Sequence, residues 1–146
     1  MIKSANTPAA RKAAERVDKL LLYVIENSPA DEVWKEISFG DGYYFISSKG
    51  RVISLCYNQP RVLKPYLCND YLCVSIYGHD RRINRLVADA FIDNPENKPI
   101  AHHKDHNKLN NTVDNLEWAT HKENTVAYYA NEREKKDQEE REAAAE

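Results

Sequence analysis

The sequence has 146 residues and a mass of 16.9 kDa, the size of one ordinary domain with short additions. Hydrophobic residues make up 42% of it and charged residues 30%, so the chain can build a core and wholesale disorder is excluded. No apolar run approaches the roughly 20 residues that span a bilayer, and the N-terminus lacks the apolar stretch of a signal peptide. With an odd number of cysteines, 3, these features predict a cytoplasmic protein with no membrane partner.

The formal net charge of −2 is unevenly distributed along the chain. Residues 132–146 contain 4 basic and 7 acidic side chains, which leaves 17 basic and 16 acidic side chains in residues 1–131. The body of the protein is therefore close to neutral. Binding to nucleic acid would depend on local basic clusters, such as Arg81, Arg82 and Arg85, and not on the overall field.

The first predicted element is a helix over residues 8–26. Thr7 has the character of an N-cap, Pro8 suits the first helical position, and residues 27–29 end the pattern. Apolar side chains recur in it at helical spacing, at Ala13, Val17, Leu20, Leu21 and Val24. We expect this stripe to dock on the rest of the chain. The alternative is a homodimer, or a partner protein, held through this helix.

Between Val33 and Tyr77, short β-type runs alternate with turn residues. Residues 43–46 and 52–55 flank a Ser-Lys-Gly turn and predict a hairpin. Residues 61–67 and 71–77 predict a second pair of strands around an Asn-Asp turn, closed by residues 78–80.

The remaining elements are a short helix followed by a strand–loop–strand–helix unit. Residues 82–91 carry apolar side chains at helical spacing and precede a loop over residues 93–99. Residues 100–103 and 115–120 predict two strands. The turn region between them contains asparagines that fold onto nearby backbone, at Asn107, Asn110 and Asn111. Thr120 and Glu123 form a capping-box pattern, so a helix is expected to begin at His121 and to continue into the charged tail.

This last unit resembles the HNH (His-Me finger, ββα-metal) endonucleases of the phage homing type. The resemblance rests on His102-His103, on Asn115-Leu116-Glu117-Trp118 and on Asn124, which occur in the order typical of that family. The upstream stretch that contains Glu32-Val33-Trp34-Lys35-Glu36-Ile37 and Gly50-Arg51-Val52 is similar to the NUMOD-type module that often precedes such nucleases. Together the matching segments cover roughly residues 32–129.

The resemblance implies a role for each residue of the motif. Hydrolysis of a phosphodiester needs a base for the attacking water and a cation for the charge that develops on the phosphate. His103 is the implied general base, since a neutral imidazole has a pKa of about 6.5. His102 and Asn124 are the implied metal ligands, and Asn115 is assigned to the catalytic group as the amide that ties the intervening loop and steadies the base.

The implied cofactor is one divalent metal ion. Two protein ligands leave most coordination positions to water and to DNA phosphate, which suits Mg²⁺ or Mn²⁺. The family commonly has an Asn or Asp where this chain has His102, and a nitrogen ligand makes Zn²⁺ or Ni²⁺ a further choice. Adjacent strand residues point to opposite faces, so His102 and His103 can share a site only if the strand ends, twists or bulges there.

The expected DNA-binding residues are Arg81, Arg82, Arg85 and His121. A solvated basic face is the alternative for the first two arginines, and a helix-start residue without a role is the alternative for His121. Cys68 and Cys73 are expected to be small packing residues on strands, with a zinc knuckle as the less favoured interpretation.

We therefore predict an α+β fold with four parts: an N-terminal helix (residues 1–30), a small antiparallel NUMOD-like β module (31–80), an HNH nuclease core (81–130) and a charged helical tail (131–146). The expected function is metal-dependent hydrolysis of DNA, by nicking or by double-strand cleavage. The alternatives are an inactive DNA-binding protein of the same fold and a related RNA nuclease. The resemblance also implies a phage-encoded or mobile-element-encoded protein that acts on DNA in a bacterial host cell.

Overall fold

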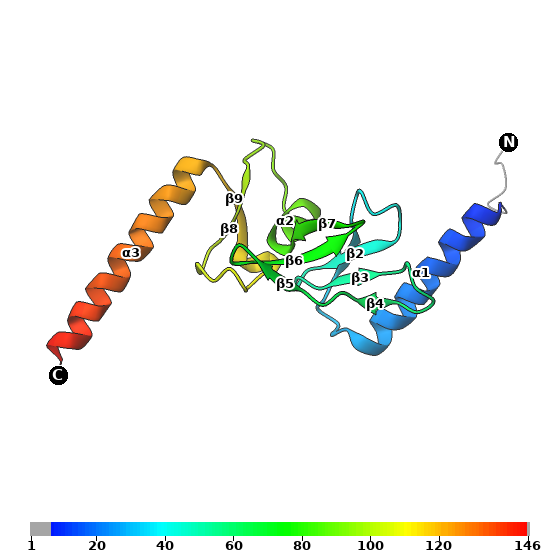
Figure 1. The fold of residues 1–146 in the computed structure, drawn as a ribbon, viewed down its shortest axis with the longest axis horizontal. Coiled ribbons are helices and arrows are strands. Elements are labelled where there is room, and N and C mark those ends of the chain that lie inside the picture. The colour runs from blue at the N-terminus through cyan, green and yellow to red at the C-terminus, as the bar shows by residue number, and fades with distance from the viewer. Residues whose placement is uncertain (1–6, 146) are drawn as a thin grey trace.

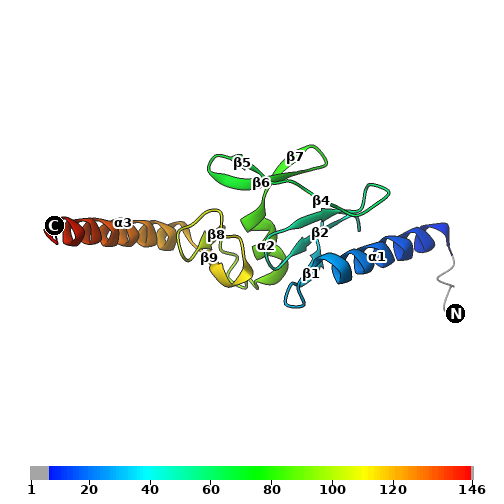
Figure 2. The same cartoon turned by 90° about the horizontal axis from the view of Figure 1, so that it is seen from below.

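The computed structural model describes residues 7–145. It contains three helices, α1 (Pro8–Asn27), α2 (Ile83–Phe91) and α3 (His121–Ala144), together with three small antiparallel sheets. The strands surround α2 in a central body, and α1 and α3 project from opposite ends of this body (Figures 1 and 2). The predicted α+β class is confirmed.

None of the helices formed by residues 7–145 combines the length and apolar character that a membrane span requires.

The first sheet has the strand order β1-β2-β3-β4, and its central hairpin confirms the sequence-based prediction. Its strands are β1 (Trp34–Glu36), β2 (Tyr44–Ser47), β3 (Val52–Ser54) and β4 (Arg61–Val62). The turn between β2 and β3 includes Gly50, whose φ of +83° lies in the left-handed region that favours glycine.

The second sheet differs from the sequence-based prediction in two places. It consists of β5 (Tyr66–Cys68), β6 (Tyr71–Ile76) and β7 (His79–Arg82). The single strand predicted for residues 61–67 is wrong: β4 pairs with β3 of the first sheet, whereas β5 pairs with β6. Pro65 lies between the two strands and has no N–H to donate to a ladder, which explains the break.

The second difference concerns residues 79–82, predicted as a turn and the start of a helix. They form β7, which pairs with β6 from Cys73↔Arg82 to Ile76↔His79. The tight turn lies one step earlier, at Tyr77 and Gly78, both with positive φ. Helix α2 therefore begins at Ile83, one residue after the predicted start, and both Arg81 and Arg82 lie on β7.

The third sheet pairs β8 (Ile100–His103) with β9 (Leu116–Ala119), and a short 3₁₀ turn, η1 (Val113–Asn115), precedes β9. Helix α3 follows directly and begins with the predicted capping box. The Thr120 hydroxyl accepts from the Glu123 N–H at 3.1 Å, and the Glu123 carboxylate accepts from the Thr120 N–H at 2.8 Å.

One core joins the sheets through α2. The buried face of this helix packs with side chains of the first sheet, of β6 and of β9, in a cluster that includes Ile46, Val52, Val74, Ile76, Ile83, Leu86, Val87 and Leu116. Full burial of a side chain of this size contributes about 1.5–3 kcal/mol. The strand pair that carries His102 and His103 is thus anchored to the upstream sheet by a shared core.

Helix α1 docks on the first sheet, which confirms the predicted docking. Its buried Leu20 packs with Ile53 and Leu55, and the Arg16 guanidinium lies 4.2 Å from the centre of the Tyr43 ring. Helix α1 also exposes apolar side chains at Val17, Leu21, Leu22 and Ile25. A second copy or a partner protein bound through this helix stays a prediction.

Candidate active site

His102 and His103 lie at the end of a strand, as their shared role would require. Their register partners on β9 are Glu117 and Leu116, and β8 ends at His103. Beyond it the chain turns sharply, with the His106 N–H donating to the His103 carbonyl at 3.0 Å and φ of +59° at His106. Both imidazoles line the same cavity, of about 280 Å³.

The side chains of His102 and Asn124 meet in this cavity. His102 Nδ1 lies 3.1 Å from Asn124 Oδ1, and both residues are half-buried. Asn124 occupies the first turn of α3, where its backbone N–H donates to the Thr120 carbonyl at 3.0 Å. The capping box that begins this helix therefore also aims the carboxamide at His102.

His103 is buried, with 5% of its surface exposed. Its Nε2 lies 2.7 Å from Oδ1 of Asn111, which is also buried. Burial lowers the pKa of His103, and the hydrogen bond with Asn111 and the charge of Asp105 oppose this shift only in part. The imidazole is therefore neutral at physiological pH and able to accept a proton.

Asn115 ties the loop between β8 and β9, and its amide makes three hydrogen bonds. Oδ1 accepts from the Asp105 N–H at 3.1 Å, and Nδ2 donates to the Asp105 carboxylate at 2.8 Å and to the Asn110 carbonyl at 2.9 Å. Hydrogen bonds from the Asn110 side chain above all, and then from the Asn107 backbone N–H and the Asn115 side chain, hold the pKa of Asp105 below its ordinary value. The side chain that hydrogen-bonds to the ring of His103 is that of Asn111, one of the asparagines predicted to form turns, and not that of Asn115.

A second cavity, of about 440 Å³, adjoins the first. It is lined by Arg81, Arg82 and Arg85, and the two cavities share Tyr71, Ile100 and Ala101. The Arg82 guanidinium lies 4.2 Å from the centre of the Tyr71 ring, and the Lys108 ammonium lies 4.8 Å from it. The three predicted arginines are thus brought beside the histidine cavity. His121, by contrast, is exposed at the start of α3 and lines neither cavity.

Asn84 connects α2 to the strand that carries the histidines. Its Nδ2 donates to the Ala101 carbonyl at 3.0 Å. Its Oδ1 is buried without a hydrogen-bond partner among residues 7–145. The buried amide thus holds β8 against the central helix immediately before His102.

The donor set suits one divalent ion with an open coordination sphere. Two ligand atoms about 2.1 Å from an ion and about 90° apart are separated by about 3 Å, which is close to the 3.1 Å between His102 Nδ1 and Asn124 Oδ1. The residues that the structure describes contain no group of three or more His, Cys, Asp or Glu side chains that could hold a metal. Water and substrate oxygens would therefore have to complete the sphere, and the zinc knuckle considered for Cys68 and Cys73 does not form among these residues.

Comparison with known proteins identifies two motifs in this chain. The NUMOD4 motif matches residues 32–77, and an HNH endonuclease motif matches residues 93–126. An uncharacterized HNH endonuclease of Acanthamoeba polyphaga mimivirus is 44% identical over 88 residues, which are 57% of this chain and 26% of the relative. The DNA endonuclease I-HmuI of Bacillus phage SP01 is 34% identical over 96 residues, which are 62% of this chain and 54% of that enzyme.

A solved structure has the same fold. It is that of the HNH homing endonuclease I-HmuI in a study of DNA binding and cleavage, and it superimposes with a TM-score of 0.59 at 32% identity. The match covers 68% of this chain and 59% of that one. The chain thus spans between about a quarter and about half of the length of the curated relatives it matches.

Proposed function

Since an HNH endonuclease model matches residues 93–126 and a NUMOD4 motif precedes it, we propose that this chain belongs to the HNH endonuclease family and is a metal-dependent DNA endonuclease. The proposal rests above all on one observation: the Nδ1 atom of His102 and the Oδ1 atom of Asn124 lie 3.1 Å apart in a cavity that His103 also lines. Residues from a strand end and from a helix thus converge on one site.

In the proposed mechanism, His103 removes a proton from the water that attacks a backbone phosphate. Burial favours its neutral form, which is the form that accepts a proton. His102 and Asn124 would hold a divalent ion, which would supply positive charge for the phosphate and the leaving oxygen. Asn115 keeps the loop after His103 in place through its bonds to Asp105 and Asn110.

Arg81, Arg82 and Arg85 supply the positive charge that positions the DNA backbone. They line the cavity next to the histidines, so a strand held there by its phosphates would extend into the catalytic cavity past Tyr71. The viral and phage sources of the relatives support a further proposal, that the chain is encoded by a phage or mobile element and acts in the cytoplasm of a host cell.

Plasmid cleavage by the purified protein tests this function. We expect supercoiled plasmid to be nicked or cut with Mg²⁺ or Mn²⁺ and left intact with a chelator. His103→Ala should lower the rate by about 10²-fold or more while DNA affinity is retained, since only the base is lost. His79→Ala is the matched control, because His79 is exposed on β7.

Two outcomes would contradict the proposal. Binding of DNA without cleavage, under every metal tried, would indicate an inactive DNA-binding protein. Faster cleavage of single-stranded RNA in the same assay would indicate an RNA nuclease.

The metal ligands are tested by a titration of cleavage against metal concentration. Asn124→Ala should raise the concentration needed for half-maximal cleavage by about tenfold or more, since a ligand is lost. Thr125 is the next residue of α3, and its hydroxyl donates to the His121 carbonyl of the same helix. Thr125→Ala should therefore follow the wild-type curve. Identical curves for Asn124→Ala and wild type would remove Asn124 from the ligand set.

A further inference from the structure

We propose that Asn111 is a positioning residue that holds the catalytic imidazole in its Nε2–H tautomer, and that the turn at Gly50 of the NUMOD4 segment holds Asn111 in place. The inference rests on the proposed function, in which His103 is the general base. It gives the NUMOD4 segment a role inside the active site.

The tautomer follows from the chemistry of the contact between the two side chains. Asn111 presents its carbonyl oxygen to His103 Nε2 at 2.7 Å, and a carbonyl oxygen can only accept a hydrogen bond. Nε2 therefore carries the proton, and Nδ1 of the neutral ring keeps the lone pair. No residue in the described part of the chain forms a hydrogen bond with this Nδ1, so it is the atom free to take a proton from water.

Burial makes this contact a strong constraint. His103 is 5% exposed and Asn111 is 6% exposed, so water competes poorly for either group. Asn115 cannot take over the task, because its amide is occupied by Asp105 and Asn110. The two buried asparagines of the loop thus have different partners: Asn115 bonds within the loop, and Asn111 bonds to the imidazole ring of His103.

Asn111 is in turn packed under the turn between β2 and β3. A Cβ atom added at Gly50 would lie 3.0 Å from the Cβ atom of Asn111 and 3.0 Å from its backbone carbonyl oxygen. Two residues later, the Val113 N–H donates to the Ser48 carbonyl at 2.9 Å. The turn therefore fixes the backbone of the loop at the asparagine and two residues after it.

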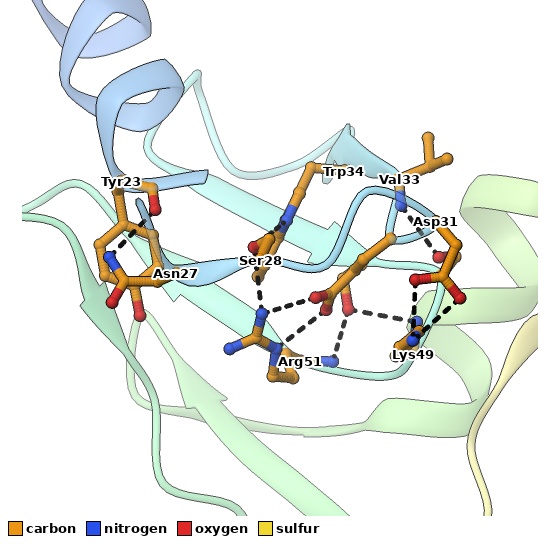
Figure 3. A network of polar contacts seen from close by, with 11 residues as sticks. Tyr23, Asn27, Ser28, Asp31, Val33, Trp34, Lys49 and Arg51 are labelled. Carbon is orange, nitrogen blue, oxygen red and sulfur yellow. Dashed lines mark hydrogen bonds and ion pairs between the residues drawn. The ribbon is translucent and has the colours of Figure 1, made fainter. Parts of the chain in front are cut away.

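A polar network holds the turn itself rigid (Figure 3). The Ser47 hydroxyl accepts from the backbone N–H groups of Lys49 at 3.2 Å and of Arg51 at 3.0 Å. The Arg51 guanidinium donates to both oxygens of Glu32, at 2.9 and 2.6 Å, and the Glu32 side chain is 1% exposed. A continuous series of contacts runs from this ion pair through Gly50 and Asn111 to His103.

The tautomer is measured directly, on the metal-free protein at neutral pH, by long-range proton–nitrogen correlation spectra of the histidine rings. Wild type should show His103 as the Nε2–H tautomer. Asn111→Asp keeps an acceptor oxygen of the same shape and should preserve it, whereas Asn111→Leu removes the acceptor and should give a mixture. An Nδ1–H tautomer in wild type, or an unchanged ring in Asn111→Leu, would overturn the proposal.

Cleavage supplies the second readout. We expect Asn111→Leu to lower the single-turnover rate by about 10²-fold with little change in DNA affinity, and Asn111→Asp to restore most of it. Asn110→Ala is the matched control, since it removes a loop hydrogen bond to Asp105 without contacting His103. Equal losses of rate in Asn111→Leu and Asn110→Ala would show a merely structural role.

The role of the turn is tested by a pair of glycine substitutions. Gly50→Ala and Gly78→Ala carry similar backbone strain, with φ of +83° and +77°, but an added Cβ at Gly78 meets no atom within 4 Å. Only Gly50→Ala should change the His103 tautomer and the cleavage rate. Equal changes of tautomer and cleavage rate in the two variants would show that the NUMOD4 turn does not position Asn111. If wild type cleaves no nucleic acid, the proposed function fails, and the tautomer spectra still decide the positioning of His103.

Discussion

Two buried asparagines in the β8–β9 loop, Asn111 and Asn115, form hydrogen bonds with different partners. Asn115 directs both ends of its amide into the loop, to Asp105 and to Asn110. Asn111, four residues earlier, directs its carbonyl to the imidazole of His103. The same residue type therefore supports the loop at one position and the imidazole ring of His103 at the other, because each amide takes the partners that its local backbone offers.

The first prediction concerns Asn115. Asn115→Ala should lower the free energy of unfolding by about 1–3 kcal/mol, because it removes three hydrogen bonds and leaves the Asp105 N–H without this acceptor. Thermal unfolding would show this as a Tm lower by several degrees. Asn107→Ala, at an exposed position of the same loop, should unfold closer to wild type. Equal Tm values for Asn115→Ala and wild type would contradict the tethering role.

At the level of elements, the β2–β3 turn is supported by the ion pair between Arg51 and Glu32. Glu32 is buried and Arg51 covers it with two hydrogen bonds. These bonds hold the pKa of Glu32 below its ordinary value of 4.5 against the opposing effect of burial. A carboxyl group with a depressed pKa stabilises the folded state above its unfolded pKa, and this contribution is lost as the pH falls through the folded pKa.

Arg51→Ala should therefore cost about 3 kcal/mol at neutral pH, since it leaves a buried carboxylate unpaired. The difference from wild type should shrink as the pH falls through the depressed folded pKa of Glu32, where the carboxylate becomes protonated. Urea unfolding at a series of pH values measures both effects. Lys49→Ala is the control, because the pair of Lys49 with Asp31 is exposed, with side-chain exposures of 40% and 74%, and should contribute little to stability. A difference that stays constant with pH would exclude Glu32 as the titrating group.

At the scale of the whole molecule, the arginines of the second cavity and the described residues of the acidic tail (132–145) lie in different parts of the structure. The tail belongs to α3, which has no buried residue in its described part and projects away from the body (Figure 1). The arginines that line the second cavity lie on β7 and α2, within the body. Binding of DNA should therefore depend on these few side chains, because the protein as a whole carries a net charge of −2.

The salt dependence of DNA affinity tests this separation. Arg82→Ala should reduce the slope of log K against log salt concentration by about 0.9, the value for one lost phosphate contact. Arg133→Ala, on the exposed part of α3, should leave the slope unchanged. Fluorescence anisotropy of a labelled duplex at several salt concentrations measures both variants. A slope in Arg82→Ala equal to that of wild type would remove Arg82 from the DNA-binding surface.

The sequence by itself determined the elements whose signals are local. The Thr7-Pro8 start of α1, the β2–β3 hairpin and the capping box of α3 all depend on residues within a few positions of one another, and all are present. The resemblance carried by His102, His103, Asn115 and Asn124 also predicted that His102 and Asn124 lie close together, and they do, but it did not single out Asn111.

Tertiary structure decided the features whose partners are distant in sequence. Residues 61–67 were divided between two sheets, and residues 79–82 became a strand, because a strand's hydrogen bonds depend on which edge is available beside it. The same reason separates Asn111 from its neighbouring asparagines: composition makes them alike, and only folding places one of them between the imidazole of His103 and the turn at Gly50.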